Sequence, residues 1–283
     1  MPESPVPLSP PEILIRPEAL WTAGAHAQEA NRPTPLVHDP WAAEFLAAAG
    51  FTGGPPGNGP LQQLLPDWMV VRTRFFDDFL LAAAETGRRQ VVLLGAGLDA
   101  RAFRLEWPDG VRVFEVDDAS VFALKERVLG GRRPPRAERT VVEADLAADW
   151  GPALIAAGFD PARPTAWLCE SPLYFREPDQ VAAVAAVMAA LSAPGSTFSA
   201  ECVNARAAGS PFVAPFLTSL ASRGLGWHWQ IGDPVNWWGS LGWATQVADL
   251  FALPYAMERF ATLLPFLTKA GAAKVVFLVT GVR

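Results

Sequence analysis

The stretch that decides the fold is VVLLGAGLDARAFRL, residues 91–105. A run of aliphatic residues leads into a turn framed by Gly95 and Gly97, and a helix-like segment follows the turn. This order is typical of the nucleotide-binding turn of doubly wound α/β sheets, where the glycines let a ligand approach the backbone. Residues 95–100 also fit the pattern G-x-G-x-x-A, and Glu115 follows at the distance expected for a dinucleotide site. The stretch therefore predicts a nucleotide site, with a tight turn that binds nothing as the plainer alternative.

Strand-like and helix-like segments alternate along the chain on both sides of this turn. We expect strands at 90–94, 111–116, 140–144, 165–170, 196–202 and 274–280, and helices at 72–86, 119–129, 150–157 and 178–191. Such alternation predicts βαβ units and a mostly parallel central sheet with helices on both faces, an α/β fold. The last strand lies close to the C-terminus, and this leaves room for an antiparallel edge strand.

Residues 203–271 break this alternation. They include GLGWHWQIGDPVNWWGSLGW, residues 224–243, which holds five tryptophans. We expect an insertion, at about 203–271, that packs over the carboxyl ends of the strands, where ligands bind in such sheets. The tryptophans are either core residues or the walls of an aromatic pocket. Residues 1–71 are expected to form an N-terminal arm and helical cap, and residues 72–283 the sheet domain.

Composition narrows the class of partner. The net charge of −6 and the isoelectric point of about 5.2 argue against a nucleic acid, which needs a basic face. The two cysteines, Cys169 and Cys202, lie far apart in apolar segments and are expected to be buried thiols in a reducing cytosol. No metal-ligand spacing and no apolar run of about 18 residues is present. We expect a cytoplasmic protein that binds a small-molecule substrate, does not associate with a membrane and binds no metal ion. A homodimer remains an open alternative.

Asp99 helps to choose the nucleotide. A carboxylate within roughly 5 Å of a pyrophosphate costs on the order of a kcal/mol or more, unless Arg101 or Arg104 offsets it. Asp99 is otherwise explained as a helix N-cap. S-adenosyl-L-methionine avoids the conflict, because it carries adenosine, a sulfonium and an amino acid but no phosphate.

Acidic residues stand at three successive strand ends, which share one edge of a parallel sheet. Asp117 and Glu115 close the second strand, where ribose hydroxyls need acceptors. Asp145 and Leu146 close the third strand, where a carboxylate and a backbone N–H can read adenine. Glu170 closes the fourth strand and is placed to meet an ammonium group. Each acid alone is explained as a solvated loop charge, but together they favour S-adenosyl-L-methionine.

Six blocks in order resemble a known family: RTRFFDD (72–78), VVLLGAGLDARAFRL (91–105), VFEVDDASVFALK (113–125), VVEADLAADW (141–150), GFDPARPTAWLCESPLYF (158–175) and LGW (241–243). They are similar to the leucine carboxyl methyltransferase-like group of class I S-adenosyl-L-methionine-dependent methyltransferases, which includes bacterial O-methyltransferases of secondary metabolism. The resemblance implies a Rossmann-like class I fold. It also implies a cofactor site made of Arg72, which would pair with the methionine carboxylate, Gly95, Ala96, Gly97, Glu115, Asp117, Asp145, Leu146 and Glu170.

The chain departs from the family pattern at two places. ESPLYF, residues 170–175, stands where E-G-L-L-x-Y-L is common, and His26-Ala27 stands where an R-A pair is common. Three functions therefore remain. The favoured one is an O-methyltransferase that acts on a small-molecule carboxylate or hydroxyl in secondary metabolism. The others are an NAD(P)-dependent oxidoreductase and an S-adenosyl-L-methionine-binding protein that has lost methyl transfer.

The catalytic candidates depend on the acceptor. A carboxylate acceptor needs no general base, whereas a hydroxyl needs one. His228, between two tryptophans, is a candidate base or a wall residue, and His26 and His38 are further candidates. Tyr174 follows the fourth strand and is expected either to hydrogen-bond an acceptor oxygen or to pack in the core.

Overall fold

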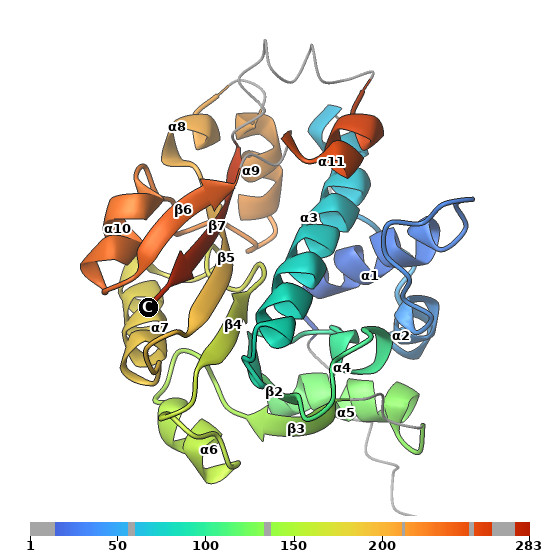
Figure 1. Cartoon of the computed structure of the whole chain (residues 1–283). Coiled ribbons are helices and arrows are strands. Elements are labelled where there is room, and N and C mark those ends of the chain that lie inside the picture. The colour runs from blue at the N-terminus through green and yellow to red at the C-terminus, as the bar shows by residue number, and fades with distance from the viewer. Residues whose placement is uncertain (1–14, 56–59, 133–136, 211–212, 249–251, 262–274) are drawn as a thin grey trace, which may run out of the picture.

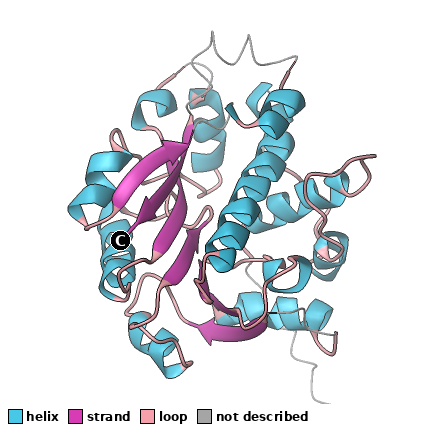
Figure 2. Cartoon of the chain, viewed as in Figure 1, coloured by secondary structure: helices cyan, strands magenta, loops and turns pink. Residues whose placement is uncertain are grey.

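The computed structural model describes residues 15–55, 60–132, 137–210, 213–248, 252–261 and 275–283. A seven-stranded sheet runs through the molecule in the order β3-β2-β1-β4-β5-β7-β6 (Figures 1 and 2). The first five strands are parallel, and β7 runs antiparallel to both its neighbours. The strands are β1 (Gln90–Leu94), β2 (Arg112–Asp117), β3 (Glu138–Glu143), β4 (Thr165–Cys169), β5 (Thr197–Val203), β6 (Ala244–Ala248) and β7 (Val276–Val282).

The helices cover both faces of this sheet (Figure 1). They are α1 (Pro17–Glu29), α2 (Ala42–Ala48), α3 (Pro60–Glu85), α4 (Arg101–Arg104), α5 (Ala119–Leu129), α6 (Gly151–Ala156), α7 (Pro178–Ala190), α8 (Ala205–Ala208), α9 (Ala214–Ala221), α10 (Pro234–Ser240) and α11 (Pro254–Arg259). The prediction of a Rossmann-like α/β fold is confirmed, because this strand order places the reversal between β1 and β4, where such sheets bind ligands.

Two apolar layers hold the helices to the sheet. On one face, α3 places Phe76 and Leu80 against Val91 and Val113, as the predicted apolar helix face requires. On the other face, a cluster that includes Trp167 packs under α6, α7 and α10. Strands buried on both faces read as continuous apolar runs, and for this reason β1 and β4 were recognisable in the sequence.

One strand was missed by the sequence analysis. Residues 244–248, assigned to the insertion, form β6 at the edge of the sheet, and β7 lies one place inside it. The reason is physical: β6 is short, and Val247 is exposed on it, so the segment lacks the apolar signal of a buried strand. The predicted strand 274–280 begins at a position outside the described residues, and β7 covers 276–282.

The N-terminal cap shares a helix with the sheet domain. The predicted boundary between residues 71 and 72 falls inside α3, so this one helix both covers the sheet and packs against α1. Arg259 of α11 adds a link, with its guanidinium 2.7 Å from Glu29 in α1 and 2.8 Å from Asp67 in α3. The predicted arm at residues 1–14 lies outside the described residues.

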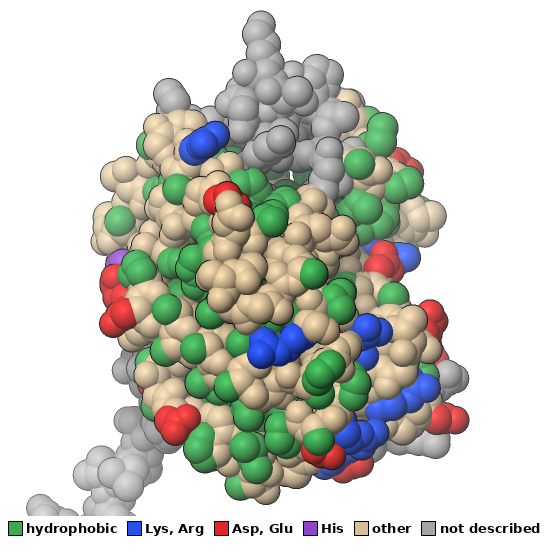
Figure 3. Space-filling view, turned by 60° about the vertical axis from the view of Figure 1, so that its left-hand side comes forward, with side chains coloured by type: hydrophobic (Ala, Val, Ile, Leu, Met, Phe, Trp, Pro, Cys, Tyr) green, Lys and Arg blue, Asp and Glu red, His purple; other side chains and the backbone are tan. Residues whose placement is uncertain are grey.

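Charged groups are mixed on the surface. On the face in Figure 3, basic and acidic side chains lie side by side rather than in separate fields. Within the described ranges no helix combines the length and hydropathy needed to span a membrane. Cys169 and Cys202 are both buried thiols, and burial raises the pKa of Cys169 to about 12.

The tryptophans of residues 224–243 divide between the two expected roles. Trp229, Trp238 and Trp243 are buried in the core, where the rings of Trp238 and Trp243 pack on Phe198 at centroid distances of 4.2 and 4.9 Å. Trp227 instead lines a cavity. The region therefore contributes a core layer and one part of a pocket wall.

Candidate functional site

Two cavities adjoin at the carboxyl ends of the strands. The turn cavity lies over the loop after β1 and holds about 900 Å³ of empty space, part of it open to solvent. The aromatic cavity holds about 880 Å³, also partly open, and is lined mainly by apolar side chains that include Trp68 and Phe216. The two cavities share four lining residues: Glu18, Thr22, Arg72 and Ser171.

The turn after β1 requires glycine for packing. Gly95 has φ +68° and Gly97 has φ +45°. A Cβ on Gly95 would lie 2.7 Å from the Cβ of Pro172, and one on Gly97 would lie 3.2 Å from the Cβ of Ala19. The turn is thus pressed between α1 and the loop after β4, and Gly95, Ala96 and Gly97 all line the turn cavity.

Asp117 faces the turn cavity from the end of β2. Its carboxylate accepts N–H hydrogen bonds from Gly97 at 2.6 Å and from Asp118 at 2.8 Å, and burial raises its pKa. Each carboxylate oxygen keeps acceptor capacity for a ligand hydroxyl. Asp117 therefore lines the turn cavity with acceptor capacity, and its role at a ribose stays a prediction.

Glu115 does not reach the turn cavity. It is fully buried and pairs with Lys125 at 2.7 Å and with Arg139 at 2.9 Å. Burial alone would raise the pKa of Glu115, but the two cations outweigh it and hold the pKa below its usual range. Because α5 places Lys125 over it, this carboxylate ties α5 and β3 to β2, and the described turn-cavity lining does not include it.

Asp145 and Leu146 also lie outside the described lining of the turn cavity. The exposed Asp145 carboxylate accepts the N–H of Ala147 at 2.8 Å and lies 3.9 Å from Arg176. The side chain of Leu146 is buried, with its Cδ1 3.8 Å from where a Cβ on Gly95 would lie. Leu146 thus lies beside the glycine turn, and the role of both residues at adenine stays a prediction.

Asp99 is not free to repel a phosphate. Its carboxylate accepts the backbone N–H of Arg101 at 2.6 Å and also pairs with the Arg101 guanidinium. The N-cap of the helix that follows is Ala100 and not Asp99, so the N-cap explanation is wrong: the Asp99 carboxylate accepts the N–H two residues further on, in the turn before the helix. The argument from Asp99 against a pyrophosphate is weaker than the sequence suggested.

Arg72, predicted to pair with the methionine carboxylate, and Glu170, predicted to meet the methionine ammonium, pair with each other. Arg72 lies with its Nε 3.0 Å from Glu170 and its Nη1 2.9 Å from Glu201. Glu170 also lies 2.6 Å from Arg101. Burial alone would raise the pKa of Glu170, but Arg101 and Arg72 outweigh it and lower the pKa to about 2. Both residues line the turn cavity, so their charges are available there only as members of this buried network.

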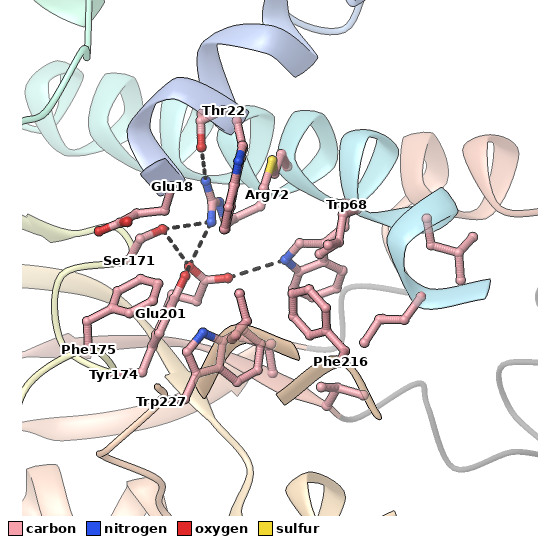
Figure 4. Close-up of a pocket in the computed structure, with 18 of the residues that line it drawn as sticks. Glu18, Thr22, Trp68, Arg72, Ser171, Tyr174, Phe175, Glu201, Phe216 and Trp227 are labelled. Carbon is pink, nitrogen blue, oxygen red and sulfur yellow. Dashed lines mark hydrogen bonds and ion pairs between the residues drawn. The ribbon is translucent and has the colours of Figure 1, made fainter. Parts of the chain in front are cut away.

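Glu201 is a site residue that the sequence analysis did not identify. It lies on β5, is 1% exposed, and accepts hydrogen bonds from Trp68 at 3.2 Å, Arg72 at 2.9 Å, Ser171 at 3.1 Å and Tyr174 at 3.3 Å (Figure 4). The available signal was an acid inside the apolar strand TFSAECV, since a buried strand carboxylate needs partners.

Ser171 explains the departure ESPLYF. It has φ +71° and is the one non-glycine residue with positive φ among the described residues. It therefore adopts the backbone conformation for which glycine is favoured, at the position where the family pattern has glycine. Its hydroxyl accepts from Arg72 at 2.8 Å and donates to Glu201, so it adds a polar contact on the wall between the cavities.

Tyr174 and His228 have different positions. The Tyr174 hydroxyl lies in the wall of the aromatic cavity, and burial and Glu201 raise its pKa well above the usual value. The His228 ring is exposed, lies 3.1 Å from Glu177, and is not part of the described lining of either cavity. The structure thus brings Tyr174 to the site as a hydrogen-bonding group but does not bring the candidate base His228 there.

His26, at the second departure, lines the turn cavity. Its ring nitrogens lie 3.1 Å from Asp39 and 3.1 Å from the hydroxyl of Thr73, which donates to Glu170 at 3.1 Å. His26 thus connects α1 to the buried charge network. His38 is exposed.

The turn cavity fits S-adenosyl-L-methionine. The glycine turn allows close backbone approach, and Asp117 offers open acceptor positions to a diol. The lining of the turn cavity supplies carboxylates and several guanidinium groups for the amino-acid end. Within the described ranges no three His, Cys, Asp or Glu side chains gather as metal ligands.

Comparisons with known proteins identify the family. Residues 19–189 match the family described as leucine carboxyl methyltransferase. Two similar proteins bear the name "Putative S-adenosyl-L-methionine-dependent methyltransferase". The one from Parafrankia sp. is 43% identical over 249 residues, 85% of this chain and 80% of its own length. The one from Frankia alni is 38% identical over 258 residues, 83% of this chain and 86% of its own length.

A solved structure supports the fold. A DUF574 family protein from Streptomyces avermitilis is similar with a TM-score of 0.62 at 15% identity, over 95% of this chain and 100% of that chain. The family match spans more than half of this sequence and the relatives cover most of it. The chain belongs to the leucine carboxyl methyltransferase family of S-adenosyl-L-methionine-dependent methyltransferases.

Proposed function

We propose that the protein is an O-methyltransferase that methylates a small molecule of secondary metabolism held in the aromatic cavity. The observation that carries the proposal is the shared wall: Glu18, Thr22, Arg72 and Ser171 line both cavities. A cofactor in the turn cavity and an acceptor in the aromatic cavity would therefore meet across these residues.

For a carboxylate acceptor the chemistry asks little of the protein beyond alignment, whereas a hydroxyl acceptor also needs a group that takes its proton. S-adenosyl-L-methionine held in the turn cavity would supply a methyl group on a sulfonium for transfer to the acceptor oxygen, and S-adenosylhomocysteine would be the product that leaves. Holding the partners in line contributes roughly 7–11 kcal/mol in favourable cases. The walls formed by Trp68, Phe216 and Trp227 supply the dry surroundings that strengthen this alignment.

Binding of S-adenosylhomocysteine tests the cofactor site. We expect Asp117→Ala to weaken binding by roughly 1–3 kcal/mol, because a ribose hydroxyl loses its acceptor and Gly97 loses its carboxylate partner. Asp118→Ala is the matched control, since its side chain is exposed and forms no cap hydrogen bond with α5. Isothermal titration calorimetry measures both, and equal affinities in the two variants would contradict the assignment.

Two other measurements separate the alternatives. An NAD(P)-dependent oxidoreductase would bind NAD or NADP in the same titration and ignore S-adenosylhomocysteine. A protein that has lost methyl transfer would bind S-adenosylhomocysteine yet label nothing in a native small-molecule extract supplied with methyl-labelled cofactor. The proposed function predicts a labelled ether or ester in that extract by mass spectrometry.

A further inference from the structure

The aromatic cavity contains little free positive charge. Arg72 is the one cation among the described residues that line it. Its Nη1 donates to Ser171 and Glu201, its Nη2 donates to Thr22 at 3.2 Å, and its Nε lies 3.0 Å from Glu170. Because the carboxylates of Glu170 and Glu201 already balance its positive charge, Arg72 is poorly suited to bind the carboxylate of an acceptor.

The same cavity carries two carboxylates of its own, Glu18 and Glu201. Glu201 is occupied by its four donors, which come from α3 and from the loop after β4 (Figure 4). Glu18, in the first turn of α1, is different: its carboxylate has a hydrogen bond from its own backbone, and no other described side chain holds it, although Arg16 and Asp117 lie near enough to influence it. Burial raises the pKa of Glu18.

The position of Glu18 places this carboxylate at the junction of the cavities. It lines both of them, and Figure 4 shows it beside Ser171, on the side away from Trp68. An acceptor atom that reaches the Glu18 side of the shared wall approaches this carboxylate. A second carboxylate there would face like charge in poorly solvated surroundings, whereas a hydroxyl can donate a hydrogen bond to it.

The remaining polar groups suit a neutral oxygen compound. The indole N–H of Trp227 is buried without a partner among the described residues, and its ring packs against Tyr174 at 5.1 Å and Phe216 at 5.7 Å. A buried donor of this kind favours a ligand that brings an acceptor atom. The apolar walls favour a ligand whose other surface is apolar.

We infer that the acceptor is a neutral, largely apolar molecule methylated on a hydroxyl group, and that Glu18 is the residue that selects hydroxyl over carboxylate acceptors. In this reaction the oxygen–methyl bond would form as the methyl–sulfur bond breaks, S-adenosylhomocysteine would be the leaving group, and the hydroxyl proton would pass to the Glu18 carboxylate. The inference rests on the proposed function and narrows its acceptor class.

Matched probes test the selection by binding. The full-length protein, saturated with S-adenosylhomocysteine at about pH 8, is titrated calorimetrically with three pairs: phenol and benzoate, 2-naphthol and 2-naphthoate, and 4-hydroxybiphenyl and biphenyl-4-carboxylate. At that pH these hydroxyls are neutral and the carboxylates are charged. We expect the hydroxyl member to bind at least about tenfold more tightly in each pair that binds. A carboxylate that binds as tightly as its hydroxyl partner, or no hydroxyl probe that binds up to about 1 mM, would overturn the inference.

The variant Glu18→Gln tests the residue. We expect the preference for hydroxyl over carboxylate probes to fall at least about fivefold, because the negative charge is gone while the size is kept. Glu138→Gln, an exposed carboxylate at the start of β3, is the matched control and should keep the wild-type preference. An unchanged preference in Glu18→Gln, whether or not S-adenosylhomocysteine binding is weaker, would contradict the assignment of Glu18 as the residue that selects the acceptor.

The two levels of failure are distinct. If wild-type protein does not bind S-adenosylhomocysteine at all, the proposed function fails. If it binds S-adenosylhomocysteine and prefers carboxylate probes, only the inference about the acceptor fails.

Discussion

Ser171 serves both as a backbone bend and as a polar contact. An L-residue in the left-handed region carries a cost of roughly 1–2 kcal/mol that glycine avoids. Here the hydroxyl joins Arg72 to Glu201 on the wall shared by the cavities, which glycine could not do. Serine at this position therefore carries the cost of a left-handed backbone conformation and provides a hydrogen-bonding contact at the site.

Two substitutions separate these contributions. Ser171→Gly and Ser171→Ala both remove the hydroxyl, but only alanine keeps the Cβ that strains a φ of +71°. We expect the alanine variant to have a free energy of unfolding about 1 kcal/mol lower than the glycine variant in urea. At Ser222, where φ is −62°, the same pair should show alanine at least as stable as glycine. Equal stabilities at position 171 would show that the backbone there is unstrained.

At the scale of elements, the turn between β1 and α4 is positioned by its neighbours. Gly95 lies under Pro172 of the loop after β4, and Gly97 lies under Ala19 of α1. The sequence pattern predicted glycines for a ligand, and the structure shows that packing of the chain alone demands them. The predicted approach of a ligand and the packing against Pro172 and Ala19 therefore both require glycine at positions 95 and 97.

Two glycines with similar φ allow the packing demand to be measured. Gly95 has φ +68° and a close neighbour, whereas Gly110 has φ +76° and open space. We expect Gly110→Ala to lower the free energy of unfolding by about 1 kcal/mol, and Gly95→Ala to lower it by about 2 kcal/mol more. Gly95→Ala should also weaken S-adenosylhomocysteine binding. Similar losses in both variants would mean that Pro172 yields easily to the new methyl group.

The elements themselves were predicted well where their signals are local. The limits of β1 and α5 agree with the prediction, because an aliphatic run marks the strand and Gly130 follows the helix. β6 was missed because an exposed edge strand carries little apolar pattern. Of the predicted cofactor residues, Asp117 and Gly95 line the turn cavity, whereas Glu115 is covered by α5, and no short-range pattern distinguishes a covered strand acid from an open one.

At the scale of the whole molecule, buried carboxylates tie α3 to α4 and to the loop after β4 at the edge of the sheet. Glu170, after β4, lies against Arg72 of α3 and Arg101 of α4, and Asp77 of α3 lies 2.6 Å from both Arg101 and Arg104. Burial alone would raise the pKa of Asp77, but Arg104 and Arg101 outweigh it and keep its pKa low. Acid should therefore weaken the junction on which both cavities depend.

The pH dependence has a definite sign. Glu170 has a pKa of about 2 in the folded protein against 4.5 ordinarily, so its ionised form favours folding above about pH 4.5. That contribution, roughly 3 kcal/mol, is lost as the pH falls towards 2. We expect Glu170→Gln to unfold at lower urea concentration at neutral pH and to lose less stability between about pH 6 and about pH 3 than the wild type. Parallel pH profiles for the two proteins would show that Glu170 is not held ionised.

The sequence by itself determined the α/β alternation, the glycine turn and the family, because these depend on neighbours along the chain and on the rule that parallel strands end at one edge. Only the tertiary structure decided which charges are free. Glu201 meets Trp68 across 133 positions, and Glu170 pairs with Arg72 instead of standing open. Such contacts arise when α1 and α3 pack over the strand ends, and the energy of a buried charge depends on what surrounds it in space.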